Sequence, residues 1–174
     1  YLDSAGSSQK PTQLIESLKR VYETEYSNVH RGLHYMSEQT SARYEEARSK
    51  VAKFLNAEFD QEIIFTKGTT ESINLVASSF GRKNLGPDDE ILITWAEHHS
   101  NIIPWQLLRD QIGCEIKVVP VDDDGAISLE SFKKLISKKT KIVAFCHVSN
   151  VLGTVLPVKE VAEIAHQNGA VVVI

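Results

Sequence analysis

The sequence is poor in cysteine: only Cys114 and Cys146 occur in 174 residues, and they form no CxxC pair. Two widely separated cysteines exclude a disulfide-rich secreted scaffold and a zinc knuckle, and they suit a reducing compartment. Long hydrophobic runs are also missing, since none approaches the roughly 18–20 residues that a membrane span needs. We therefore expect a cytoplasmic protein that does not associate with membranes.

An excess of charge of one sign is missing as well. The 19 basic and 23 acidic residues are dispersed and give a net charge of −4, which leaves no basic patch for nucleic acid. His30 and His34 have a spacing that could present two metal ligands on a helix, but Gly32 lies between them and no apolar stripe accompanies them. We expect neither a nucleic-acid partner nor a metal site.

Methionine is represented only by Met36, and the chain begins at Tyr1. It ends in the apolar run 171–174, which is typical of a buried strand, whereas a natural carboxyl terminus is usually exposed and frayed. We expect the chain to be a piece of a longer protein.

What the sequence does contain is a regular alternation of two hydrophobic periods. Two helices are expected first, one opened by Lys10-Pro11 and one from about Ser37 to Leu55. Short apolar runs then alternate with segments of helical periodicity, and the predicted strands are 63–66, 90–94, 116–119, 141–146 and 170–174. This alternation predicts an α/β fold, with a largely parallel sheet and helices on both faces.

Three loops that follow predicted strands carry the most reactive side chains. Ligands of open parallel α/β sheets bind beyond the carboxyl ends of the strands, so residues 67–70, 97–101 and 147–150 are expected at one edge. In the first loop, Gly68 precedes Thr69 and Thr70 at the start of a helix. Unpaired helix N–H groups and two hydroxyls would suit a phosphate, although Thr69 could instead only cap the helix.

The second and third loops contribute a ring and an amide. His98 can stack on a flat ring or move protons near neutral pH, or it can be an ordinary hydrogen-bonded histidine at a helix entry. Asn150 can donate to a phenolate or carboxylate oxygen, or it can satisfy a turn. An anion cradle, an aromatic stack and an amide donor at one sheet edge suit a flat phosphorylated cofactor such as pyridoxal phosphate.

At these motifs the sequence resembles the SufS-type (group II) cysteine desulfurases and selenocysteine lyases, which are class V aminotransferase-like enzymes of fold type I. The resemblance spans essentially the whole chain, in order. The segments that carry it are Tyr1–Ala5, Asn28–Gly32, Gly68–Val76, Glu97–Asn101 with Pro104–Gln106, and His147–Thr154.

The resemblance implies an incomplete large domain of the pyridoxal-phosphate-dependent transferases. Residues 1–36 would form an N-terminal arm, a helix and an active-site loop, and residues 37–174 would form part of the cofactor-binding domain. The implied enzyme is a homodimer that removes sulfur from L-cysteine, which leaves L-alanine and an enzyme persulfide. A sulfur-acceptor protein of iron–sulfur cluster assembly would then receive that sulfur.

The resemblance also implies roles for six residues of this chain. Thr69 and Thr70 would bind the cofactor phosphate, and Asn150 would reach the cofactor's O3′ oxygen or the substrate carboxylate. His98 would stack on the pyridine ring and act catalytically in proton transfer. His30 and Arg31 lie in a loop that members of the family place near the substrate.

Other family residues lie beyond this chain: the Schiff-base lysine, the aspartate at the pyridine nitrogen and the persulfide cysteine. Neither Cys114 nor Cys146 matches the persulfide position, and Cys146 is expected to be a buried strand cysteine. The piece alone should therefore be inactive. The alternatives are a selenocysteine lyase, which requires L-selenocysteine, another class V enzyme, or a stand-alone binding module.

Overall fold

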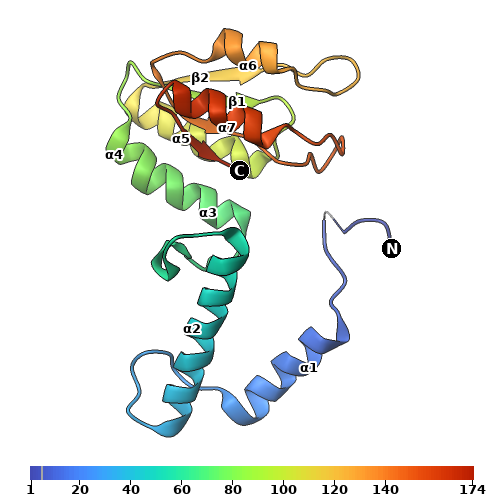
Figure 1. Ribbon diagram of the computed structural model, residues 1–174, viewed down its shortest axis with the longest axis vertical. Helices are drawn as coiled ribbons and strands as arrows, with labels where there is room; N and C mark the ends of the chain where they lie inside the picture. The colour runs from blue at the N-terminus through green and yellow to red at the C-terminus, as the bar shows by residue number, and fades with distance from the viewer. Residues whose placement is uncertain (5) are drawn as a thin grey trace. The chain divides into compact units, whose positions relative to one another are not determined.

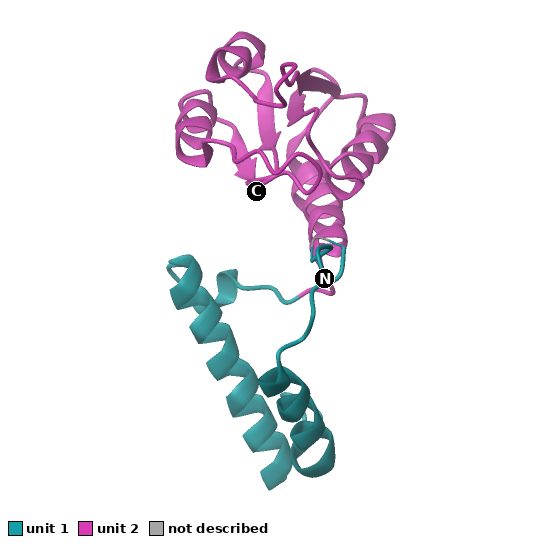
Figure 2. Ribbon diagram, turned by 90° about the vertical axis from the view of Figure 1, so that its right-hand side faces the viewer, with its two compact units in different colours: residues 1–65 teal, residues 66–174 magenta. Residues whose placement is uncertain are grey.

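The computed structural model describes residues 1–4 and 6–174, which divide into two compact units, Tyr1–Phe65 and Thr66–Ile174 (Figure 1, Figure 2). Ala5, the last residue of the first family motif, lies outside the described residues. The division after residue 36 that the resemblance implies concerns domains of a whole enzyme, and it stays a prediction.

The first unit is helical, as its sequence predicts. Its elements are α1 (Thr12–Arg20), the π-helical turn η1 (Val21–Glu25), α2 (Tyr35–Leu55) and the 3₁₀ turn η2 (Asp60–Glu62). Pro11 stands at the N-cap position of α1, where its fixed φ suits a helix start. Asn56 ends α2 in the left-handed conformation, with φ of 56°.

Hydroxyl side chains in the first turns of α2 hold the loop that precedes this helix. Ser37 Oγ donates to Asn28 O (2.7 Å) and accepts from the Gly32 N–H (3.0 Å). Ser41 Oγ accepts from the His30 N–H at 2.8 Å. The backbone of residues 28–32 is therefore fixed to α2, although it is an irregular segment.

The second unit contains the α/β fold that the sequence predicts. Its elements are α3 (Thr69–Val76), the π-helical turn η3 (Ala77–Gly81), α4 (Arg82–Asn84), β1 (Glu90–Thr94), the 3₁₀ turn η4 (His99–Asn101), α5 (Ile103–Ile112), β2 (Glu115–Val119), α6 (Leu129–Leu135), β3 (Thr140–Ala144), α7 (Val158–Gln167) and β4 (Val171–Val173). The four strands pair in the order β2-β1-β3-β4, and every pair is parallel.

Helices cover both faces of this sheet (Figure 2). Along β1, Leu92 packs into the cluster that contains Phe132 of α6 and Val161 of α7. Ile91 and Ile93 point to the other face, into the cluster formed with α3 and α5. All five residues of β1 are buried, which is typical of a central parallel strand.

The predicted strand over residues 63–66 is wrong, because the described part of the chain has no strand there. A short apolar run becomes a strand only where a neighbour's backbone pairs with it. Here the Ile63 carbonyl accepts instead from the Arg48 guanidinium, and Phe65 contacts the Tyr44 ring edge-on. Ile64 remains 67% exposed.

A buried carboxylate joins three strands at the edge of the sheet opposite the loops that follow β1 and β3. Glu90, at the amino end of β1, is 5% exposed and accepts from Lys117 Nζ (2.7 Å), Ser137 Oγ (2.7 Å) and Thr140 Oγ1 (3.0 Å). Burial raises the pKa of Glu90, but the hydrogen bonds from these three groups outweigh that effect, so the pKa lies below its ordinary value.

We expect the Glu90→Gln variant to lose about 2–3 kcal/mol of unfolding free energy at pH 7, because one buried donor then lacks its acceptor. Since the folded-state pKa of Glu90 lies below the unfolded value of about 4.3, its contribution is complete above that pH. The difference between wild type and variant should shrink as the pH falls through the folded-state pKa. Urea denaturation between pH 7 and pH 3 measures it.

Glu163→Gln is the matched control, because this glutamate is exposed on α7 and should change the unfolding free energy little. A Glu90→Gln variant as stable as Glu163→Gln at pH 7 would contradict the assigned role.

Candidate functional site

The first loop presents an open helix N-terminus. Gly68 stands at the N-cap of α3 with φ of 154° and ψ of 179°, a conformation that is essentially restricted to glycine. A Cβ at this position would meet no atom within 4 Å, so the space beside the backbone is open. Thr69 is the first residue of the helix and does not cap it, and no side chain caps α3.

The hydroxyls of Thr69 and Thr70 are exposed and, within the described residues, neither makes a hydrogen bond. They stand beside the unpaired N–H groups of the first turn, at the positive end of the helix dipole. Glu71 turns back, and its carboxylate accepts from the Lys67 N–H at 2.5 Å. The free hydroxyls and N–H groups are the donors that a phosphate dianion requires.

The second loop fixes the orientation of His98 through its own backbone. Nδ1 of His98 accepts from the Ser100 N–H (3.1 Å) as the N-cap of η4, and Ser100 Oγ lies 2.9 Å from the same nitrogen. An Nδ1 that accepts from a backbone N–H places the proton of the neutral ring on Nε2. The ring is exposed, so Nε2 and the ring face remain available to a ligand.

Glu97, the residue before His98, connects the second loop to the third. Its carboxylate accepts from Thr94 Oγ1 at the end of β1, from Asn101 Nδ2 (2.7 Å) in η4, and from the Cys146 N–H (3.1 Å) after β3. Asparagine 101 also belongs to the turn that packs against α3. The structure therefore joins the second loop to the third, and it places the turn of the second loop against the helix that the first loop begins.

The third loop leaves the side chain of Asn150 free. Ser149 Oγ meets the local backbone needs, since it accepts from the Leu152 N–H (3.2 Å) and donates to Ala96 O (3.5 Å). Asn150 is exposed, and its amide makes no hydrogen bond among the described residues. Ser149 thus performs the turn role that Asn150 could have had, and the Asn150 amide stays available to a ligand.

Cys146 lies beside this junction but is a poor nucleophile. Burial, together with the nearby Glu97 carboxylate, raises the pKa of its thiol to about 11. Cys114 is buried directly before β2, and burial raises its thiol pKa as well. Neither thiol has the exposed, electropositive surroundings of a reactive cysteine.

His30 and Arg31 belong to the first unit, whereas Thr69, Thr70, His98 and Asn150 belong to the second. His30 adopts a φ of 65°, its Nε2 lies 3.0 Å from Glu45 Oε1, and its ring packs edge-on against Tyr44. Arg31 is exposed and has no ion-pair partner among the described residues. Of these two side chains, only that of Arg31 lacks a polar partner among the described residues.

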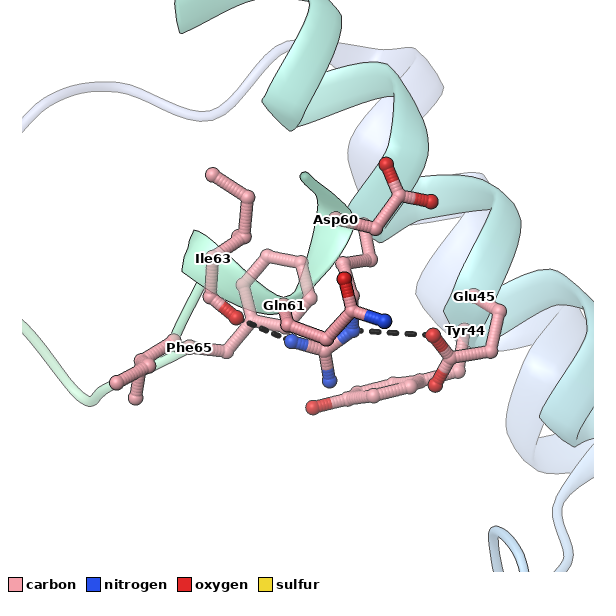
Figure 3. A pocket seen from close by; sticks show the side chains of 8 residues that line it. Tyr44, Glu45, Asp60, Gln61, Ile63 and Phe65 are labelled. Atoms are coloured by element: carbon pink, nitrogen blue, oxygen red, sulfur yellow. Dashed lines mark hydrogen bonds and ion pairs between the residues drawn. The ribbon is translucent and has the colours of Figure 1, made fainter. Parts of the chain in front are cut away.

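A hollow of about 440 Å³ lies in the first unit, between α2 and the segment after η2 (Figure 3). The guanidinium of Arg48 packs 5.2 Å from the ring centre of Tyr44 and 5.4 Å from that of Phe65. It also donates to Glu45 (3.0 Å) and to Ile63 O. Because all of these contacts hold the unit together, the guanidinium is not available to an anionic ligand.

Residues 1–4 and 6–174 contain no group of three or more His, Cys, Asp or Glu side chains placed to hold a metal ion. Within the same residues, no helix has both the length and the apolar composition to cross a membrane.

Sequence comparison matches the family described as aminotransferase class-V over residues 1–174. A probable cysteine desulfurase of Halalkalibacterium halodurans is 55% identical over the whole chain, which covers 43% of that protein. The cysteine desulfurase of Synechococcus elongatus is 49% identical, and the chain covers 28% of its length. The chain thus spans less than half of the curated relatives named here.

Solved structures give the same match. The apo structure of cysteine desulfurase from Thermococcus onnurineus superposes with a TM-score of 0.91 at 39% identity, over 99% of this chain and 42% of that one. A structure described as SspA in complex with cysteine superposes with a TM-score of 0.88 at 26% identity, over 99% of this chain and 49% of that one.

We expect alkylation of Cys146 by iodoacetamide to be at least about tenfold slower at pH 7 than that of an unperturbed thiol of pKa about 8.5. With a pKa of about 11, roughly one thiol in ten thousand is ionised at that pH. The rate should rise about tenfold per pH unit up to pH 9, as peptide mass spectrometry of the folded full-length protein would show. The same peptide labelled in urea is the control, and fast labelling of the folded protein at pH 7 would contradict this assignment.

Proposed function

The chain belongs to the aminotransferase class-V family, and we propose that it supplies the N-terminal part of a pyridoxal-phosphate-dependent cysteine desulfurase. The observation that carries the proposal is the hydrogen-bonded junction, at the carboxyl edge of the parallel sheet, between the loops that bear His98 and Asn150, together with the contact of η4 with α3, the helix that Thr69 and Thr70 begin. The names of the relatives support the same activity.

The residues present fit the phosphate of the cofactor. Gly68 leaves open space at the start of α3, and Thr69 and Thr70 offer hydroxyls that no protein group occupies among the described residues. These hydroxyls, with the N–H groups of the first turn, would hold the phosphate against the helix dipole. Any other residue at position 68 would force the backbone into a conformation that only glycine tolerates.

His98 and Asn150 would hold the ring of the cofactor. The imidazole of His98, oriented by Ser100, would stack on the ring and present Nε2 to the reacting atoms, where it would hold or deliver a proton. The amide of Asn150 would donate to the O3′ oxygen or to the substrate carboxylate. When bound, pyridoxal phosphate supplies an electron sink for the bonds around the substrate Cα.

The substrate of the proposed reaction is L-cysteine, and the products are L-alanine and a persulfide on a cysteine outside this chain. Neither Cys114 nor Cys146 carries the sulfur in this proposal, in keeping with their raised pKa values. The loop of His30 and Arg31 would lie near the substrate, as the family resemblance implies, and the pair of His30 with Glu45 would shape that loop.

The proposal extends to the assembly and setting of the enzyme. The full enzyme would be a cytoplasmic homodimer that passes its sulfur to an acceptor protein of iron–sulfur cluster assembly. These statements depend on the family resemblance, and gel filtration and acceptor pull-down of the full-length protein would test them.

The test of the activity uses the full-length protein loaded with pyridoxal phosphate. We expect L-cysteine and a reductant to yield alanine and sulfide in equal amounts. L-selenocysteine, assayed in parallel, separates a desulfurase from a selenocysteine lyase, since a lyase would release selenide and leave L-cysteine unchanged. A protein that binds the cofactor but converts neither substrate would overturn the proposal.

The double variant Thr69→Ala with Thr70→Ala should raise the dissociation constant for pyridoxal phosphate about tenfold or more, because two donors to a charged phosphate are removed. Equilibrium dialysis of the full-length protein measures this constant. Ser78→Ala removes an exposed hydroxyl further along the same helical segment and should leave the constant unchanged. Equal affinities of the double variant and the control would remove Thr69 and Thr70 from the phosphate site.

A further inference from the structure

A buried indole begins a chain of hydrogen bonds beneath His98. Trp105 of α5 has no exposed surface, and its Nε1–H donates to Asn101 Oδ1 at 2.8 Å. An indole nitrogen can only donate, so the atom of Asn101 that faces it must be an acceptor. Trp105 therefore decides which way the amide of Asn101 points.

The orientation of Asn101 in turn decides what must face it. With Oδ1 toward Trp105, the amide Nδ2 points at Glu97 Oε2, at 2.7 Å. Asn101 is 7% exposed, so water cannot readily replace this acceptor. Glu97 Oε2 must consequently accept.

The second carboxylate oxygen of Glu97 must also accept hydrogen bonds. Oε1 accepts from Thr94 Oγ1 and from the Cys146 N–H at 3.1 Å. Both oxygens of Glu97 therefore face donors, and a carboxylate meets this demand because each of its oxygens accepts. A glutamine, with an acceptor on one side and a donor on the other, would leave one buried donor opposite another donor.

We propose that Glu97 is a positioning residue of the cofactor site: as a carboxylate set by Trp105 and Asn101, it fixes the loop of His98 to the loop of Asn150. The inference deepens the proposed function and rests on it. Glu97 directly precedes His98, and its acceptor contact at Cys146 lies at the start of the segment that leads to Asn150. A shift of either loop would move the His98 imidazole and the Asn150 amide apart, and small misplacements of reacting groups lower reaction rates strongly.

The test exchanges the carboxylate and the amide of the hydrogen bond between Glu97 and Asn101, in the full-length protein. Glu97→Gln places a donor against the Asn101 amide, and Asn101→Asp places a second carboxylate against Glu97. In the double variant, the new Asp accepts from both Trp105 and the new Gln, whose oxygen still accepts from Thr94 and Cys146. Every donor of the network is then satisfied again.

We expect each single variant to bind pyridoxal phosphate about tenfold more weakly and to change the visible circular dichroism of the bound cofactor. The double variant should return within about threefold of wild type and regain its spectrum, with kcat for L-cysteine following the same pattern. Glu163→Gln, an exposed glutamate on α7, is the control and should match wild type in every readout.

The outcomes separate this inference from the proposed function. Wild-type affinity and spectrum in Glu97→Gln, or a double variant as impaired as the singles, would overturn the role of Glu97. If the single variants do not fold, recovery of a folded, cofactor-binding double variant supports the inference, and failure of the double variant overturns it. If wild type binds no cofactor, the proposed function fails and this inference fails with it. If wild type binds the cofactor but does not turn over, the proposed activity fails, and the comparison of affinities and spectra still decides the role of Glu97.

Discussion

The parallel pairing of β1 with β3 is the constraint on which the site depends. Parallel strands end at the same edge, so the segments that leave β1 and β3 emerge side by side although they are about fifty residues apart in the chain. Burial of the pair on both faces by two apolar clusters removes the freedom to slip, since a shift of one residue would exchange the two faces. Side chains of these two loops, which are far apart in the sequence, are thereby brought close together in space.

The sheet was largely predictable because buried strands are short apolar runs between helical periods. The run at 63–66 has the same composition, and its failure to form a strand shows that composition does not supply a pairing partner. The side chains of β1 alternate between the two faces, with Leu92 on one and Ile91 and Ile93 on the other, as the geometry of a strand requires. Pairing order depends on contacts between distant segments, which periodicity does not encode.

The candidate site residues could be selected because their chemistry is conspicuous, whereas the groups that orient them were not. Glu97 lies in the same motif as His98, but its residue type did not mark it as a site residue, since acidic residues in loops are usually solvated. Its position after a buried strand, with Thr94 before it and Asn101 after it, is the signal that could have identified it. That Ser149, and not Asn150, satisfies the turn depends on side-chain directions that the sequence does not specify.

The raised pKa of the Cys146 thiol affects sulfur transfer in the proposed enzyme. Thiol exchange begins with attack by a thiolate, so a thiol that is almost entirely protonated at pH 7 attacks a persulfide slowly. The same Glu97 carboxylate that organises the loops also disfavours ionisation of this neighbouring thiol. In the proposed enzyme, Cys146 would therefore compete poorly for the sulfur of a persulfide, which would stay on the cysteine that carries it.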